Sequence, residues 1–201
     1  MGGEKFVERT LVLLKPDAVL RGITGLIMDR FERVGLKTVA LKMIQASREQ
    51  ILKHMPIKDT QWIAGMGRKS LESYKTFGLN PNEEFGTDDP ERIGMMILEW
   101  NIQYLLSGPV IAVVFEGVRA ISLVRKIIGD TIPAKAMPGT IRGDFASNST
   151  DYANAEKCSC KNVVHASGNQ AEAEIEINVW FSPEEILSYE RAEEKCMFKK
   201  I

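Results

Sequence analysis

The chain has 201 residues, a length typical of one domain that can bury a full core. Its composition, 44% hydrophobic and 26% charged, is that of an ordinary globular protein, and a formal net charge of -1 gives no reason to expect a nucleic-acid or anionic-membrane partner. No apolar run approaches the roughly 18 residues that a membrane-spanning helix needs, and the first ten residues lack the charged-then-apolar layout of a signal peptide.

The first part of the chain predicts a strand, a helix, a second strand and a second helix. The first strand is a short apolar run, TLVLL, which Lys15-Pro16-Asp17 ends. Apolar residues at three- and four-residue steps predict the first helix, and alternation predicts the second strand. A capping box at its start predicts the second helix. These elements cover residues 10–14, 23–34, 39–43 and 47–56.

The second part begins less regularly and then returns to clear periodicity. Residues 78–92 are rich in turn formers and acids, which predicts a solvated loop. A helix, a strand, an amphipathic helix and a further strand follow at residues 96–106, 110–115, 118–128 and 163–164. Ser182, with Pro183 at the first helical position and Glu185 three residues on, predicts the start of a C-terminal helix.

The order of these elements predicts an α+β fold. Strand, helix, strand and then strand, helix, strand is the pattern of a ferredoxin-like βαββαβ sandwich. Such a fold has a four-stranded antiparallel sheet with helices on one face. We expect residues 1–201 to form a single domain with two inserted segments, at about 55–95 and 146–160, and a C-terminal helix.

The cysteines bear on the cellular compartment. The chain has three, so they cannot all pair within one chain. Cys158 and Cys160 are too closely spaced for an ordinary zinc half-site, and no second pair of cysteines completes one. We interpret them as reduced thiols and therefore expect a cytoplasmic protein.

Four short stretches combine phosphate-binding side chains with glycine or proline. Two arginines offer planar forks for phosphate oxygens, a lysine adds a point charge and a threonine adds a neutral donor. Neither a Walker A loop nor the glycine-rich loop of protein kinases is present. The stretches are KPDAV at 15–19, RKIIGDT at 125–131, PGTIRGDF at 138–145 and NVVHAS at 162–167.

His165, one of only two histidines, follows two valines of a predicted strand. An isolated histidine in such a place is most often a core residue whose ring nitrogens are satisfied. The alternative is a catalytic imidazole, because a neutral imidazole both accepts protons and attacks phosphorus.

The four stretches, together with SGPVIAVVFEG at 107–117, resemble the nucleoside diphosphate kinase family in sequence and order. The resemblance covers residues 8–54 and 104–188. It implies the ferredoxin-like fold and assembly as a homo-hexamer or homo-tetramer. It also implies that the γ-phosphate of ATP passes to a nucleoside diphosphate by a ping-pong mechanism through a phosphohistidine. Magnesium would be carried by the nucleotide's phosphates, with no metal ligand from the protein.

The resemblance also implies roles for individual residues. His165 would accept the phosphoryl group, Glu176 would hydrogen-bond the other ring nitrogen, and Ser167 is the family's serine beside the histidine. Such a carboxylate fixes the tautomer of the ring. The residues implied to bind the nucleotide are Lys15, Arg125, Thr131, Arg142 and Asn162.

The sequence departs from the family pattern at several positions. Gly168 stands where the family carries an Asp thought to arrange water around the metal. His54 is followed by Met55 instead of the family's Tyr, for which Tyr74 is a possible substitute. Counting back from SGPV without gaps puts Ile97 at the family's base-stacking Phe. The two inserted segments are expected to be surface loops, with a lid or an altered subunit contact as the alternative.

A rival hypothesis is a regulatory or scaffold protein that keeps the nucleotide pocket and has lost turnover. The complete set of polar phosphate contacts with His165 favours the enzyme, whereas the altered stretch 166–169 favours the rival. Nucleic-acid binding through a basic patch finds little support in this near-neutral composition.

Overall fold

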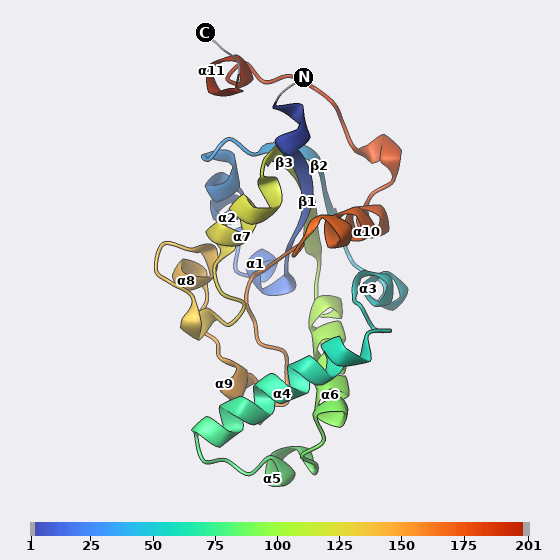
Figure 1. Ribbon diagram of the computed structural model, residues 1–201, viewed down its shortest axis with the longest axis vertical. Helices are drawn as coiled ribbons and strands as arrows, with labels where there is room; N and C mark the ends of the chain where they lie inside the picture. The colour runs from blue at the N-terminus through green and yellow to red at the C-terminus, as the bar shows by residue number, and fades with distance from the viewer. Residues whose placement is uncertain (1–2, 199–201) are drawn as a thin grey trace.

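A central sheet organises the computed structural model, which describes residues 3–198 (Figure 1). Within that range four strands pair antiparallel in the order β2-β3-β1-β4. The run Leu11–Leu14 of β1 has no exposed surface, because this central strand is covered on both faces. The prediction of an α+β, ferredoxin-like sheet is confirmed. The strands are β1 Val7–Leu14, β2 Lys37–Ile44, β3 Val110–Val118 and β4 Val164–Ala166.

Helices cover both faces of this sheet, so their predicted restriction to one face is wrong. Alternate residues of β1 enter two separate cores: Val12 and Leu14 face one, Leu11 and Leu13 the other. The first core is closed by α1 Pro16–Leu20, α2 Thr24–Glu32, α7 Ala120–Ile128 and α8 Ile141–Phe145. The second is closed by α3 Arg48–His54, α4 Thr60–Thr76, α6 Pro90–Leu106 and α10 Gln170–Trp180.

The first inserted segment is helical, contrary to the expectation of a surface loop. Helix α4 crosses α6 obliquely and packs against it beyond one end of the sheet, and the short α5 (Pro81–Phe85) lies between the two in chain order (Figure 1). Their own small core joins Tyr74, Phe85 and Ile93. At Gly67 an added Cβ would lie 1.9 Å from the Pro90 carbonyl oxygen, so only glycine permits this close approach of the two helices.

The second inserted segment contributes α9, Thr150–Ala155, which packs against α4 of the first. The contact is polar as well as apolar, since the buried Asn154 side chain donates a hydrogen bond to Ser70 Oγ at 3.0 Å. The two inserted segments therefore support one another.

The C-terminal region differs from the prediction. The capping box at Ser182 is present, but it starts only the 3-10 turn η3, Pro183–Glu185. The chain then runs beside β2, where the Leu187 amide donates to the Val39 carbonyl, and this pairing replaces further helix. The preceding helix α10, which was not predicted, and the short α11, Glu194–Phe198, complete the region. Two further 3-10 turns are η1 Glu4–Phe6 and η2 Pro133–Lys135.

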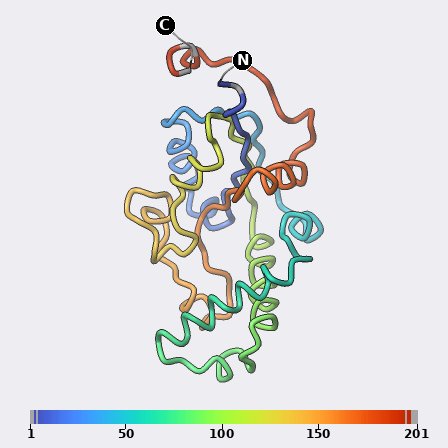
Figure 2. Tube along the Cα trace, viewed as in Figure 1, coloured from blue at the N-terminus to red at the C-terminus, as the bar shows by residue number. Residues whose placement is uncertain are grey.

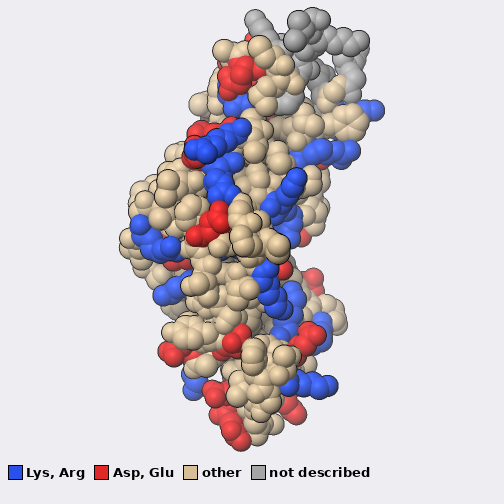
Figure 3. All heavy atoms as spheres, turned by 90° about the vertical axis from the view of Figure 1, so that its left-hand side faces the viewer, with Lys and Arg blue, Asp and Glu red and all other residues tan. Residues whose placement is uncertain are grey.

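The path of the chain brings both ends of the described region to one end of the molecule, opposite α5 (Figure 2). On the face shown in Figure 3, Lys and Arg side chains are interspersed with Asp and Glu. Among residues 3–198, none of the helices combines the length and the apolar character needed to cross a bilayer.

Candidate functional site

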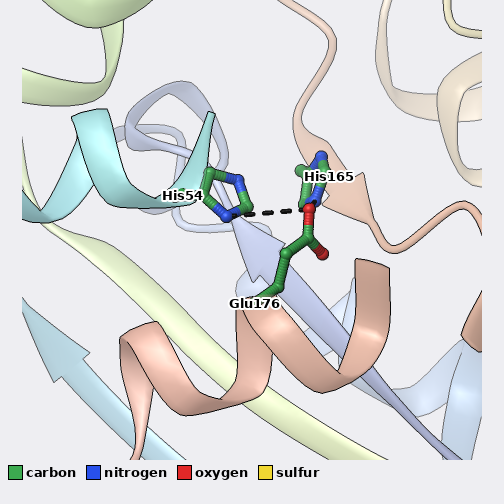
Figure 4. Close-up of side chains that lie close together, drawn as sticks. All are labelled: His54, His165 and Glu176. Atoms are coloured by element: carbon green, nitrogen blue, oxygen red, sulfur yellow. Dashed lines mark hydrogen bonds and ion pairs between the residues drawn. The ribbon is translucent and has the colours of Figure 1, made fainter. Parts of the chain in front are cut away.

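His165 lies in the short edge strand β4, opposite Leu13 of β1. Its Nε2 is 2.9 Å from Oε1 of Glu176, which reaches it from α10 (Figure 4). A carboxylate accepts hydrogen bonds, so Nε2 carries the ring proton and Nδ1 keeps its lone pair. The His165 side chain is 29% exposed, which makes the ring accessible from solvent.

Glu176 is fixed from two sides. Its Oε2 accepts a 2.6 Å hydrogen bond from Oγ of Ser167, a residue with no exposed surface. Ser167 in turn accepts from the Leu11 amide at 3.3 Å, which ties the carboxylate to the central strand. Although burial opposes ionisation, the hydrogen bond and charge of His165 hold the pKa of Glu176 below its usual value. Three residues that the sequence predicted to act together are therefore in contact.

The second histidine, His54, joins the same cluster, which the sequence reasoning had missed. It is the last residue of α3, a helix that Ser47 caps as predicted, and its ring meets that of His165 edge-on at 4.6 Å between centroids. Its Nδ1 is 3.7 Å from Oε1 of Glu176. Burial and the neighbouring His165 lower the pKa of His54 to about 3, so its ring is neutral at physiological pH.

The KPD stretch shapes the backbone just before His165. Lys15 follows β1 and precedes Pro16 at the first position of α1; its amide donates to the Val163 carbonyl at 2.9 Å. The Val163 amide donates to the Asp17 carboxylate at 3.1 Å. Val163 has φ of 57°, which is unusual for a β-branched residue, and these two bonds hold it there. The conformation turns the chain sharply between Asn162 and His165.

Lys15 and Asn162 form a polar bridge beside this turn. Lys15 Nζ donates to Asn162 Oδ1 at 2.7 Å, and Asn162 Nδ2 donates to the Thr131 carbonyl at 2.8 Å. Burial, reinforced by the charge of Arg142, lowers the pKa of Lys15 to about 8. Burying the charged form of this lysine costs free energy, and a bound anion would offset that cost.

Arg142 is buried behind the bridge. Thr140 caps α8 by accepting from the Gly143 amide, and the helix directs the guanidinium inward. It donates to the carbonyls of Gly129 at 3.0 Å, Val164 at 2.8 Å and Asn162 at 3.4 Å. Burial and the charge of Arg125 lower the pKa of Arg142 to about 10. Arg142 therefore organises the backbone around the site as well as supplying charge.

Arg125 and Thr131 are exposed near these groups. Arg125 lies in the last turn of α7, and its charge acts on Arg142. The Thr131 carbonyl accepts the hydrogen bond from Asn162 Nδ2, which places Thr131 beside the Lys15–Asn162 bridge. The phosphate-binding residues predicted from four separate stretches thus come together around one surface.

Gly168 is accompanied by a carboxylate from another position. Glu172, in the first turn of α10, accepts from the Gly168 amide at 2.8 Å and from the Asn169 side chain at 2.7 Å. An added Cβ at Gly168 would lie 2.6 Å from this carboxylate. A carboxylate, that of Glu172, therefore lies directly beside Gly168.

Two predicted substitutes lie elsewhere. Tyr74 is buried in the core between α4 and α6, and Ile97 packs against the same core, so neither serves the site. The ungapped count failed because the insertion separates the two halves of the pattern. Trp62, in the first turn of α4 and 36% exposed, is an aromatic residue that the sequence reasoning overlooked.

Comparisons with known proteins agree with this arrangement. A sequence profile described as nucleoside diphosphate kinase matches residues 8–62 and 91–186. A nucleoside diphosphate kinase of Pyrobaculum aerophilum is 47% identical over 181 residues, covering 90% of this chain and 98% of the relative. One from Borreliella burgdorferi is 39% identical, covering 94% of this chain and 95% of the relative.

Solved structures show the same likeness. The crystal structure of an NDP kinase from Pyrobaculum aerophilum has a TM-score of 0.87 at 46% identity, covering 90% of this chain and all of that chain. A transition-state mimic of the Borrelia burgdorferi nucleoside-diphosphate kinase, with bound vanadate and ADP, has a TM-score of 0.78 at 36% identity, covering 98% of this chain and 99% of that one. This chain belongs to the nucleoside diphosphate kinase family.

Proposed function

We propose that the protein transfers the γ-phosphate of ATP to a nucleoside diphosphate through a phosphohistidine at His165. The observation that supports this most strongly is the pairing of His165 Nε2 with Glu176 at 2.9 Å. With its proton held there, the ring directs a free lone pair at Nδ1 toward solvent. The rival, a binding protein without turnover, has no need of a buried carboxylate behind the ring.

The chemical steps follow from this tautomer. Nδ1 attacks the γ-phosphorus, a P–N bond forms, and the bond from that phosphorus to the β–γ bridging oxygen breaks. The nucleoside diphosphate leaves with the electron pair of that bond. The ring becomes cationic, and Glu176 balances its charge. A terminal oxygen of the second nucleoside diphosphate then attacks the same phosphorus, and the P–N bond breaks to restore neutral His165.

The cationic groups would neutralise the phosphates during both steps. In this proposal Arg125 and Arg142 bind phosphate oxygens, the Thr131 hydroxyl donates to them, and Lys15 with Asn162 spans the sugar and the terminal phosphate. The depressed pKa values of Lys15 and Arg142 support it, because clustered buried cations are stabilised by an arriving anion.

The site fits a magnesium ion carried by the nucleotide. Magnesium prefers oxygen ligands and keeps several waters, and the Glu172 carboxylate beside Gly168 could accept hydrogen bonds from such waters. The ion would supply further charge neutralisation on the phosphates. Its direct ligands would be phosphate oxygens and water.

Trp62 is proposed to cover the base in place of Ile97. An indole face stacks on any base, so acceptors with different bases should differ modestly. Trp62→Ala should raise KM for all nucleoside diphosphates more than it changes kcat. A hundredfold preference for one base in the intact enzyme would contradict this assignment.

We propose one kinase domain over residues 1–201, acting in the cytoplasm as a homo-hexamer or homo-tetramer. The exposed apolar residues Leu41 and Met43 on the edge strand β2 support association. Light scattering on the eluting protein would measure the oligomer, and a monomer would refute it.

The phosphohistidine is tested by incubating the full chain with magnesium and γ-labelled ATP alone. We expect an acid-labile, base-stable phosphate on residue 165 and its transfer to added nucleoside diphosphate. His165→Ala should remain folded, bind nucleotide and take up no label. Because the chain has only two histidines, His54→Gln serves as a matched control and should still be labelled at 165. Labelling of His165→Ala, or none in the intact chain, would refute the mechanism.

A further inference from the structure

The cluster of His54, His165 and Glu176 offers more than a phosphoryl acceptor and its partner. Each residue presents one ligand-type atom, and these three atoms lie within 4.8 Å of one another (Figure 4). His54 has no part in the phosphotransfer proposed above, yet its side chain is only 5% exposed and directed into the cluster. Its Nδ1 lacks a hydrogen-bond partner among the described residues, which is costly for a buried polar atom.

We propose that His54 Nδ1, His165 Nε2 and Glu176 Oε1 bind a divalent transition-metal ion such as Zn²⁺, and that this ion inhibits the enzyme. Two imidazoles and one carboxylate are a common ligand set for zinc, which completes its tetrahedron with water. Magnesium, in contrast, prefers oxygen ligands, so this site is separate from the ion carried by the nucleotide.

The distances suit such an ion. Bonds of roughly 2.0 to 2.2 Å in a tetrahedron separate neighbouring ligand atoms by about 3.4 Å. Glu176 Oε1 is 2.9 Å from His165 Nε2 and 3.7 Å from His54 Nδ1, so these two separations bracket the required value. All three atoms lie within 4.8 Å of one another, so side-chain rotations that bring the two imidazoles closer together would complete the geometry.

The surroundings also favour binding. Ser167 donates to Oε2 of Glu176, which orients the carboxylate and leaves Oε1 for the metal. The ring of Trp180 lies edge-on to His54 at 5.7 Å and closes the apolar side of the site. The partly exposed His165 gives the ion a path from solvent.

Inhibition follows from the position of one proton. In the free enzyme His165 carries its proton on Nε2 and donates it to Glu176. A metal on Nε2 takes that lone pair, so the neutral ring must carry its proton on Nδ1 instead. Nδ1 then has no lone pair for phosphorus. This consequence rests on the proposed phosphotransfer, whereas the metal site itself does not.

Calorimetric titration of the chelator-treated full chain with zinc chloride, without nucleotide, tests the site. We expect one zinc per chain and at least about tenfold weaker binding in His54→Gln, which keeps the size but loses the imidazole. Circular dichroism checks that this variant is folded. If it is not, His165→Gln removes a second ligand and should weaken binding equally. Undiminished zinc binding in a folded variant, or none in the intact chain, would overturn the proposal.

The three cysteines are the competing zinc ligands, so replacing Cys158, Cys160 and Cys196 together by Ser provides the matched control. The triple variant should keep the zinc affinity; its loss would assign zinc to the thiols and overturn the proposal. In kinase assays with excess magnesium, zinc should inhibit the intact enzyme and chelator should reverse this, whereas His54→Gln should need at least about tenfold more zinc. Because the titration contains no nucleotide, its failure would leave the phosphohistidine test unaffected.

Discussion

Raising the pH should disable the enzyme by neutralising Lys15. Its Nζ is held against Asn162 at 2.7 Å in a place where burial and Arg142 lower its pKa to about 8. The charged form should bind phosphate and the neutral form should not. A group with this pKa is about ten-elevenths protonated at pH 7 and about one-eleventh at pH 9. We therefore expect kcat/KM for the nucleotide to fall about tenfold between pH 7 and pH 9.

Steady-state kinetics over this range would measure the effect, because kcat/KM reports groups of the free enzyme. At saturating nucleotide the decline should shift to higher pH, since bound phosphate stabilises the charged lysine. Lys15→Arg is the matched variant: its guanidinium stays charged, so it should be slower throughout but show no decline up to pH 9. An identical alkaline decline in Lys15→Arg would refute the assignment to Lys15.

Three further perturbations address the other groups of the site. Arg142→Ala should lower the free energy of unfolding by about 2 to 4 kcal/mol, because three carbonyls lose their donor, and it should also weaken nucleotide binding. Denaturant unfolding would measure the loss of stability and calorimetry the loss of affinity. Arg142→Lys should recover only part of the stability and of the affinity. Glu176→Gln should slow phosphohistidine formation about 10- to 100-fold while leaving the label on His165. Rapid-quench labelling would measure the rate, and an unchanged rate would exclude a role of Glu176 in orienting the ring. The pKa of His54 is depressed in the folded protein, so between pH 6.5 and about 3 the unfolded chain binds a proton on His54 that the folded chain does not. The free energy of unfolding therefore falls as the pH falls through this window, by about 2 kcal/mol at pH 5. His54→Gln should reduce this loss in thermal melts, and an equal loss would contradict it.

Sequence patterns predicted those parts of the fold that depend on local spacing. The four strands, the amphipathic helix α7 and the cap at Ser47 are present, although α7 begins at Ala120 and the predicted first position, Val118, ends β3. These elements could be predicted because a helix or strand that buries one face repeats its apolar residues at a fixed spacing. The C-terminal helix failed for a tertiary reason: beyond Glu185 the chain bonds to the edge of β2. Helix α4, residues 60–76, was not predicted because its buried face packs against α6 and α9. Those two helices become its neighbours only in the folded state.

The sequence by itself identified the family, the four stretches proposed to bind phosphate and His165 as the proposed phosphoryl acceptor, since these reside in short contiguous motifs. Only the tertiary structure brought His54 against His165 and Glu176, because these residues come from α3, β4 and α10, and a motif carries no information about a neighbour far along the chain. The same holds for Glu172 beside Gly168 and for the carbonyls around Arg142. The pKa of Lys15 is set by burial and by nearby Arg142, and that of His54 by burial and by nearby His165. Burial and these neighbours arise only when the sheet and its two helical layers close around the two side chains.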